Sequence, residues 1–143
     1  MIIEILGVYR AKVRAAARKE AIQVLQMNAA LFDRLTKKLV LIELQVTDPG
    51  KRFEPWAVTQ STAKKPRPND QVGYLDEPLT PDGKAIGDFD LSSLPTAGTF
   101  RWAMFLHEFD KAKPLTYRGD AIATPKIAPM PRRLAALFKY ENP

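Results

Sequence analysis

The sequence predicts an α+β fold, with a mainly antiparallel sheet of four to six strands, or a small sandwich, and one long helix packed on one face. Two observations lead to this prediction. The first 48 residues hold a single glycine and no proline, whereas the remaining 95 hold all twelve prolines and six glycines. Long regular elements should therefore come first, and short elements broken by turns should follow. With 143 residues and no internal repeat, the chain has the size of one domain with one core, spanning residues 1–143.

Residues 2–13 have the pattern of a strand. Residues 2–9 are rich in β-branched and aromatic side chains, and beyond them apolar and basic residues alternate strictly. This period of two places Arg10, Lys12 and Arg14 on the solvent side of the strand.

Residues 15–36 predict the long helix. Strong helix formers begin it, and apolar residues then recur at helical spacing. Asn28 lies close to the apolar stripe, and 22 residues exceed the usual helix length, so a kink or an early end is an alternative.

Residues 39–47 predict the next strand. Its first half is apolar on both faces, which is typical of a central strand. Proline and glycine at 48–51 predict a turn that returns the chain through residues 53–59. We therefore expect a hairpin across residues 39–59, in which Pro55 confines the second strand to an edge or a bulge.

Shorter elements are expected after this hairpin. Residues 61–70 have the composition of an exposed basic loop, and residues 71–98 indicate short strands only. Residues 99–109 form the most apolar segment and predict a central strand. Residues 115–122 can pair back as another strand, with a bulge or turn at Gly119.

The C-terminal part is expected to combine an extended strap with a short helix. The proline-rich segment 124–131 favours extended conformations and would cover a sheet edge. Residues 131–140 predict a helix that begins at Pro131.

Charge is distributed unevenly along the chain. Residues 1–67 hold 13 Lys and Arg and 6 acids, a net charge of +7. Residues 68–98 hold 1 basic residue and 6 acids, a net charge of −5. Residues 99–143 hold 8 Lys and Arg and 4 acids, a net charge of +4. Two basic clusters could attract a polyanion, and the second could lie near the first. The candidate residues are Arg10, Lys12, Arg14, Arg18, Lys19, Lys64, Lys65 and Arg67.

No nucleic-acid-binding motif accompanies these residues, so the nucleic-acid hypothesis depends on charge alone. An ordinary solvated surface is the simpler interpretation. The six acids between residues 68 and 98 have similar alternatives: they solvate loops, attract basic segments of the same fold, or form a docking surface for a basic partner. Asp88 and Asp90 give one step of calcium-loop spacing, but no glutamate follows at the required distance.

Two single residues are further candidates. His107 is the only histidine and the only side chain that titrates near neutrality without perturbation. On a strand, Glu108 would point to the opposite face, so we expect His107 to hydrogen-bond in the core or at its rim, with catalysis as an alternative. Trp56, beside Pro55, is the candidate for an exposed partner anchor, with half-buried packing as the simpler interpretation.

Several classes of chemistry lack the residues they require. The chain has no cysteine and one histidine, so it has no disulfide, no thiolate site and no His pair for zinc. Glycine-rich phosphate loops and nucleophile signatures are also missing from the sequence. The sequence therefore predicts no catalytic, cofactor or metal site.

The expected function follows from these exclusions. No apolar run approaches the length that a bilayer requires, and the N-terminal pattern is not that of a secretory signal, so we expect a soluble cytoplasmic protein without membrane association. The leading interpretation is a small non-enzymatic protein-interaction module: an adaptor, an assembly factor, or an inhibitor or immunity-type partner. The alternative is a basic protein that binds a polyanion or nucleic acid through the clusters Arg10–Lys19 and Lys64–Arg67.

Overall fold

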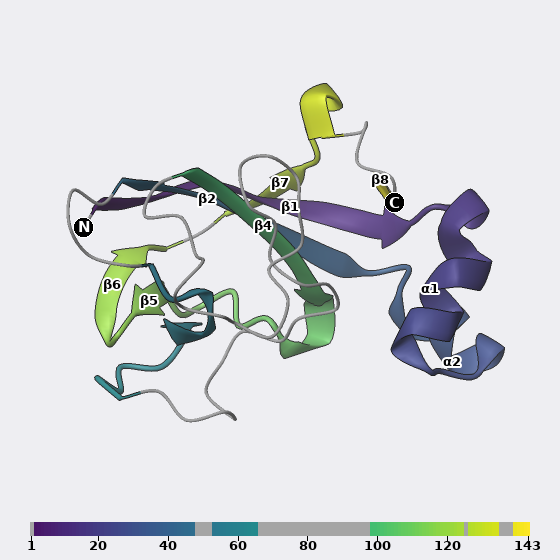
Figure 1. Cartoon of the computed structure of the whole chain (residues 1–143), viewed down its shortest axis with the longest axis horizontal. Coiled ribbons are helices and arrows are strands. Elements are labelled where there is room, and N and C mark those ends of the chain that lie inside the picture. The colour runs from purple at the N-terminus through teal and green to yellow at the C-terminus, as the bar shows by residue number, and fades with distance from the viewer. Residues whose placement is uncertain (1, 48–52, 66–97, 125, 135–138) are drawn as a thin grey trace.

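The larger of two sheets forms the centre of the fold (Figure 1). The computed structural model describes residues 2–47, 53–65, 98–124, 126–134 and 139–143, with only the main chain of Trp56, and every structural statement below concerns these residues. The fold is α+β, as predicted, with two short helices at one end of the large sheet.

The large sheet has five strands. β2 (Leu39–Thr47) lies between β1 (Ile2–Val13) and β4 (Gly98–Phe105) and pairs antiparallel with both. β7 (Ile127–Pro129) runs parallel to β1, and β8 (Tyr140–Glu141) pairs antiparallel with the end of β1. The sheet is therefore mixed, not wholly antiparallel. β7 enters it from another layer, so no hairpin fixes its direction.

A small antiparallel sheet packs on one face of the large sheet. It consists of β3 (Val58–Thr59), β5 (Leu115–Tyr117) and β6 (Asp120–Ala123), in the order β3-β5-β6. The first core lies between the two sheets, where Trp102 and Phe53 from the two layers are among its buried side chains.

A second core lies on the opposite face of the large sheet. There the C-terminal segment, described over residues 126–134 and 139–143, covers the strands. The buried residues of this core are Tyr9, Ala11, Leu39, Leu41, Ala103, Met130, Leu134 and Tyr140. Asn142 links the two ends of this segment. Its side chain accepts a hydrogen bond from the N–H of Met130 at 2.8 Å and donates one to the carbonyl of Met130 at 3.0 Å.

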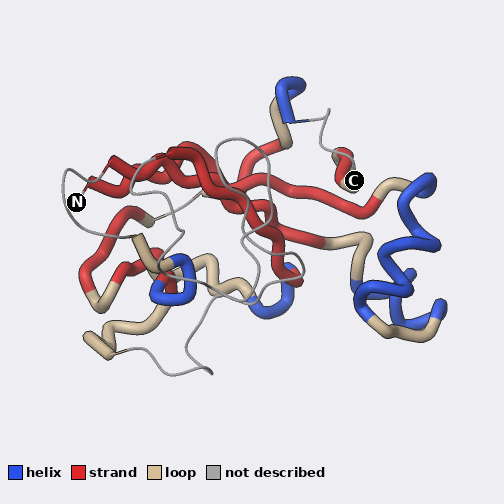
Figure 2. The backbone as a smooth tube through the Cα atoms, in the orientation of Figure 1, coloured by secondary structure: helices blue, strands red, loops and turns tan. Residues whose placement is uncertain are grey.

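The prediction of one long helix on a sheet face is wrong. A 3₁₀ turn (Ala15–Ala17) leads into α1 (Arg18–Leu25), and α2 (Ala29–Leu35) follows after a break. The break has a local cause: Gln26 adopts the left-handed conformation with φ 52°, and the Asn28 side chain caps α2 by accepting from the N–H of Leu31 at 2.8 Å. Both helices lie beyond the end of the large sheet (Figure 2).

The predicted hairpin across residues 39–59 is also wrong. β1 and β4 occupy both edges of β2 along most of its length, and β3 pairs with β5 instead. Pro55 begins a 3₁₀ turn (Pro55–Ala57) rather than a strand. The predicted turn at 48–51 and most of the segment 66–98 lie outside the described residues.

Several predictions from local patterns are confirmed. β1 and β2 have the predicted bounds, and β2 is central. A turn with positive φ at Arg118 and Gly119 joins β5 to β6. β7 pairs with residues 8–10 of β1, so the proline-rich strap covers a sheet edge. In place of the predicted C-terminal helix, the structure shows a 3₁₀ turn (Arg132–Leu134) and β8, with residues 135–138 outside the described part.

In the described part of the chain, no helix is long and apolar enough to span a bilayer.

Candidate functional site

The most strongly buried charge in the described residues belongs to Glu43, in the middle of β2. Its side chain is 0% exposed, and it lies opposite Gly7 of β1 and Arg101 of β4. Arg101 donates from Nε to Oε2 at 2.6 Å. Arg133, in the C-terminal segment, donates to both carboxylate oxygens, at 2.8 Å and 2.5 Å. These charge-assisted hydrogen bonds offset the cost of removing the carboxylate from water.

Tyr9 completes this group, which we call the Glu43 cluster (Tyr9, Glu43, Arg101 and Arg133). Its hydroxyl accepts a hydrogen bond from Arg133 at 3.2 Å and donates one to the carbonyl of Leu6 at 3.2 Å. The ring reaches Leu6 by folding back over Gly7, where an added methyl group would overlap it. The pairing of β1 with β2 shifts register between Ile5 and Gly7, beside this contact.

The protonation states of the cluster follow from these contacts. Burial raises the pKa of Glu43, but the hydrogen bonds from Arg133 and Arg101 outweigh it and hold that pKa below its ordinary value. Burial, and then the negative charge of Glu43, raise the pKa of Tyr9. At neutral pH Glu43 is ionised and Tyr9 is protonated. The cluster thus joins β2, β4 and the C-terminal segment through charged groups, and β1 through the neutral hydroxyl of Tyr9.

His107 lies outside both cores. β4 ends at Phe105, and a 3₁₀ turn (Leu106–Glu108) carries His107 and Glu108 to the surface, with side chains 61% and 48% exposed. The His107 ring stacks on Phe105, and its Nε2 lies 3.8 Å from Glu108 Oε1. The expectation that His107 hydrogen-bonds in the core or at its rim is not met in the core, because a turn replaces the last part of the predicted strand and exposes the side chain. Among the described residues, no group of three or more His, Asp and Glu is arranged to hold a metal ion.

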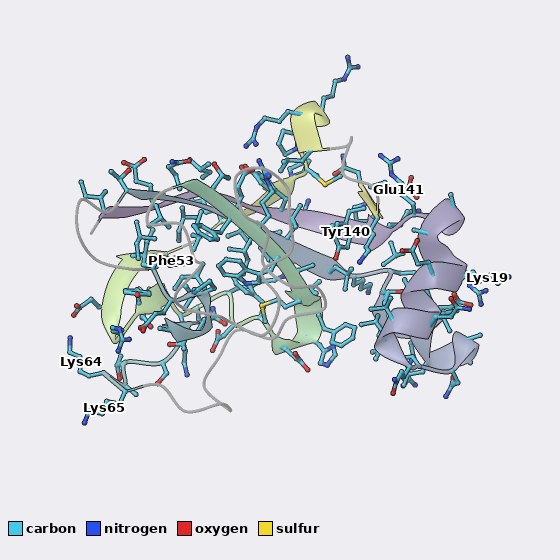
Figure 3. All side chains as sticks on the ribbon, in the orientation of Figure 1. Lys19, Phe53, Lys64, Lys65, Tyr140 and Glu141 are labelled. Atoms are coloured by element: carbon cyan, nitrogen blue, oxygen red, sulfur yellow. The ribbon has the colours of Figure 1, made fainter. Side chains whose placement is uncertain are left out.

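The two basic clusters lie at opposite ends of the molecule. Figure 3 shows Lys19, on α1, at one end of the long axis and Lys64 and Lys65 at the other. Lys64 also pairs with Asp120. Arg67 lies outside the described residues. Lys64 and Lys65 therefore do not form one patch with Lys19.

Three cations of the first cluster, Arg14, Arg18 and Lys12, make contacts within the fold. Arg18 binds Asp33 through two hydrogen bonds, of 2.8 Å and 3.0 Å, and so joins α1 to α2. These bonds hold the pKa of Asp33 below its ordinary value. Arg14 Nε donates to the carbonyl of Tyr140 at 3.0 Å. Lys12 lies 3.7 Å from Glu141, an exposed pair of the kind that contributes little to stability.

The end of the molecule that holds α1 and α2, which we call the helical end, concentrates positive charge. Residues 10–38 carry eight Lys and Arg and two acids, a net charge of +6 that equals the net charge of the whole chain. Arg10, Lys19 and Arg34 are exposed, and no ion pair to another described residue satisfies them.

The helical end also has a small apolar hollow of about 10 Å³, room for about one water molecule. It lies where α1 meets β8 and the adjoining ends of β1 and β2, and its lining residues are Val13, Ala21, Val24, Leu25, Leu39, Lys139 and Tyr140. Val24 is 59% exposed, although it belongs to the same helix face as the buried Ala21. Leu25, Leu31 and Leu35 are only partly buried. The cores of the two sheets contain no residue of either helix, so apolar side chains here remain incompletely covered.

Two predicted features lie outside the described residues, namely the side chain of Trp56 and the acidic segment from residue 68 to 97. The hypotheses of Trp56 as a partner anchor and of the acidic segment as a docking surface therefore stay predictions.

Comparison of the chain with protein-family models, with curated proteins and with solved structures gives no match. The functional argument therefore depends on the chain's own residues.

The substitution Glu43→Gln should lower the free energy of unfolding at neutral pH by about 3 kcal/mol, because two arginines lose a buried counter-charge. The folded pKa of Glu43 lies below the unfolded value of about 4.3, so its stabilising contribution is present above that pH and is lost as the pH falls. Urea unfolding from pH 7 to pH 3 should show the difference between wild type and variant shrinking. Asp120→Asn, at an exposed ion pair, is the control. A difference that stays constant with pH would contradict this assignment.

Gly7→Ala should cost about 1–3 kcal/mol of stability, because the methyl group displaces the Tyr9 ring from its hydrogen bonds. In a Tyr9→Val background the same substitution should cost less than about 1 kcal/mol, since the ring is gone. Chemical denaturation of the two single variants and the double variant measures this coupling. Strictly additive losses would show that the ring does not constrain residue 7.

Proposed function

We propose that the protein is a small non-enzymatic protein-interaction module, acting in the cytoplasm as an adaptor, an assembly factor, or an inhibitor or immunity-type partner. We propose further that it binds its partner through the helical end. The observation that carries this proposal is the combination of partly uncovered apolar side chains and unpaired cations on the same two helices.

The helices themselves support an interaction role. α1 has eight residues and α2 has seven, which is too short for either to be stable alone in water. Tertiary contacts must hold them, yet Ala21 and Phe32 are their only buried apolar residues. Burial of one more large apolar side chain contributes about 1.5–3 kcal/mol, so a partner that covers this surface would gain affinity and stabilise the helices.

The titratable groups also favour this proposal over an enzyme. The Glu43 carboxylate is enclosed and fully hydrogen-bonded by arginines. His107 is exposed, and its described acidic neighbour is Glu108, 3.8 Å away. Neither group combines a free acid or base with a cleft, which general acid–base catalysis requires.

The first test compares two matched variants in a pull-down from the native extract. Val24, in α1, and Ile2, at the start of β1, are 59% and 58% exposed. Figure 1 shows α1 and the N-terminus at opposite ends of the molecule. Immobilised wild type and Ile2→Asp should retain the same protein, and Val24→Asp should lose it, because an aspartate in the pocket is costly to bury. Retention of that protein by all three forms would contradict binding at the helical end.

A polyanion is the alternative ligand, and the net charge of the helical end is the observation that favours it. The first cluster would act alone, through Arg10, Lys12, Arg14, Arg18 and Lys19. The affinity for a 20-base-pair DNA duplex should then fall steeply with salt, with a log–log slope near −0.9 per phosphate neutralised, and Lys19→Glu should reduce the slope. Fluorescence anisotropy measures it, and no binding at about 50 mM salt would rule the alternative out.

A further inference from the structure

We infer that two copies of this chain exchange β1 when the hinge between α1 and α2 straightens into one continuous helix. The product is a domain-swapped dimer, in which β1 of each copy pairs with β2 of the other. The inference concerns a second copy of the chain, so it does not depend on the proposed partner protein.

The hinge consists of residues 26–28, and a few local features hold it bent. Gln26 lies in the left-handed region, with φ 52°, a conformation that is costly for most residues with a β-carbon. Asn28 caps α2 through an exposed side-chain hydrogen bond of 2.8 Å. An ion pair between Arg18 and Asp33 joins the two helices, but both side chains are 43% exposed, and exposed pairs contribute little to stability.

The sequence on both sides of the hinge has the pattern of a single helix. Apolar residues recur at intervals of three or four from residue 17 to residue 35, and neither glycine nor proline interrupts them. Straightening would replace one left-handed residue and one cap by the main-chain hydrogen bonds of a continuous helix. Each helix buries a single apolar residue, Ala21 in α1 and Phe32 in α2, so few tertiary contacts oppose the change.

A continuous helix cannot form while β1 and β2 of the same chain are paired. The two helices connect these strands at the helical end (Figure 1), where the N–H of Val13 donates to the carbonyl of Thr36 at 3.2 Å. One helix over residues 18–35 would place its ends about 27 Å apart. Since neighbouring strands lie only about 5 Å apart, β1 must leave its own β2 and pair with that of another copy.

The exchange preserves the contacts that hold β1 in the sheet. In the dimer β1 keeps its pairing with β2, β7 and β8, in each case with the strand of the other copy. Tyr9 likewise keeps its hydrogen bond with Arg133. The two forms therefore differ mainly at the hinge and in the entropy lost on association, so substitutions in the hinge should control the amount of dimer.

The first experiment refolds the full chain from urea at increasing protein concentration. Refolding is needed because β1 leaves the sheet only when the protein unfolds, which is slow in water. Size-exclusion chromatography with light scattering then separates monomer from dimer. We expect the wild type to form a dimer fraction that grows with the concentration during refolding.

Hinge variants should change this fraction in opposite directions. Asn28→Ala removes the cap and favours a continuous helix, which should raise the dimerisation constant about fivefold per hinge and about 25-fold for the two hinges of a dimer. Gln26→Gly favours the left-handed hinge and should lower the constant by a similar factor. Gln23→Gly is the matched control, because this exposed residue of α1 is helical in both forms. Circular dichroism confirms that each variant is folded.

A cross-link distinguishes an exchanged dimer from two copies that associate side by side. The chain has no cysteine, and Ile2 of β1 is paired with Thr47 of β2, both of them exposed. Paired antiparallel residues lie about 4.5–5.5 Å apart, which suits a disulfide in the double variant Ile2→Cys, Thr47→Cys. After oxidation, the isolated dimer should run as two linked chains on a non-reducing gel, and the isolated monomer as one chain.

The remaining outcomes overturn the inference. If the wild type forms no dimer at any concentration, β1 exchange does not occur in this chain, even where Asn28→Ala forms one. A dimer that runs as single chains after oxidation is a side-by-side association. A dimer fraction that changes equally in Gln26→Gly and Gln23→Gly does not depend on the hinge. The pull-down tests the proposed function separately, so failure of one proposal is distinguishable from failure of the other.

Discussion

The carboxylate of Glu43 determines how three distant parts of this chain meet. A buried charge is tolerated only when ionised partners surround it, and here they come from β4 and from the C-terminal segment. Since Arg133 must reach β2, the segment around it lies across the second face of the large sheet. Met130 and Leu134 then enter the second core on either side of that contact. One polar requirement therefore positions a whole layer of apolar packing.

The same segment connects the Glu43 cluster to the helical end. After Arg133 the chain reaches β8, where Arg14 holds it twice: its main-chain N–H donates to the carbonyl of Lys139 at 2.7 Å, and its side chain donates to the carbonyl of Tyr140 at 3.0 Å. Tyr140 thereby contributes to the second core and to the lining of the pocket. The strands on this side of the helical end are thus fixed by bonds that do not involve the helices, so a partner that binds there would meet a preorganised surface and would lose less entropy.

Local patterns in the sequence were sufficient for some elements and insufficient for others. The bounds of β1 and β2 follow from alternation and apolar content, which are properties of neighbouring residues. The broken helix depended on Gln26 and Asn28, where a left-handed residue and a cap outweighed the apolar periodicity. The Glu43 cluster was beyond sequence reasoning, because Arg101 and Arg133 lie 58 and 90 residues away and no local pattern identifies a partner at that distance. The surface position of His107 was missed because a 3₁₀ turn replaces the end of the predicted strand.

The separation of charge from the cores has a consequence for how binding and folding are linked. Cations crowd the helical end, so their mutual repulsion acts on two short helices that bury one apolar residue each. A ligand that neutralises these cations and covers Val24 removes both weaknesses together. Because any ligand that binds only the folded state stabilises it, a partner that covers Val24 would also stabilise α1 and α2. Affinity for such a partner and the stability of α1 and α2 would then be thermodynamically linked.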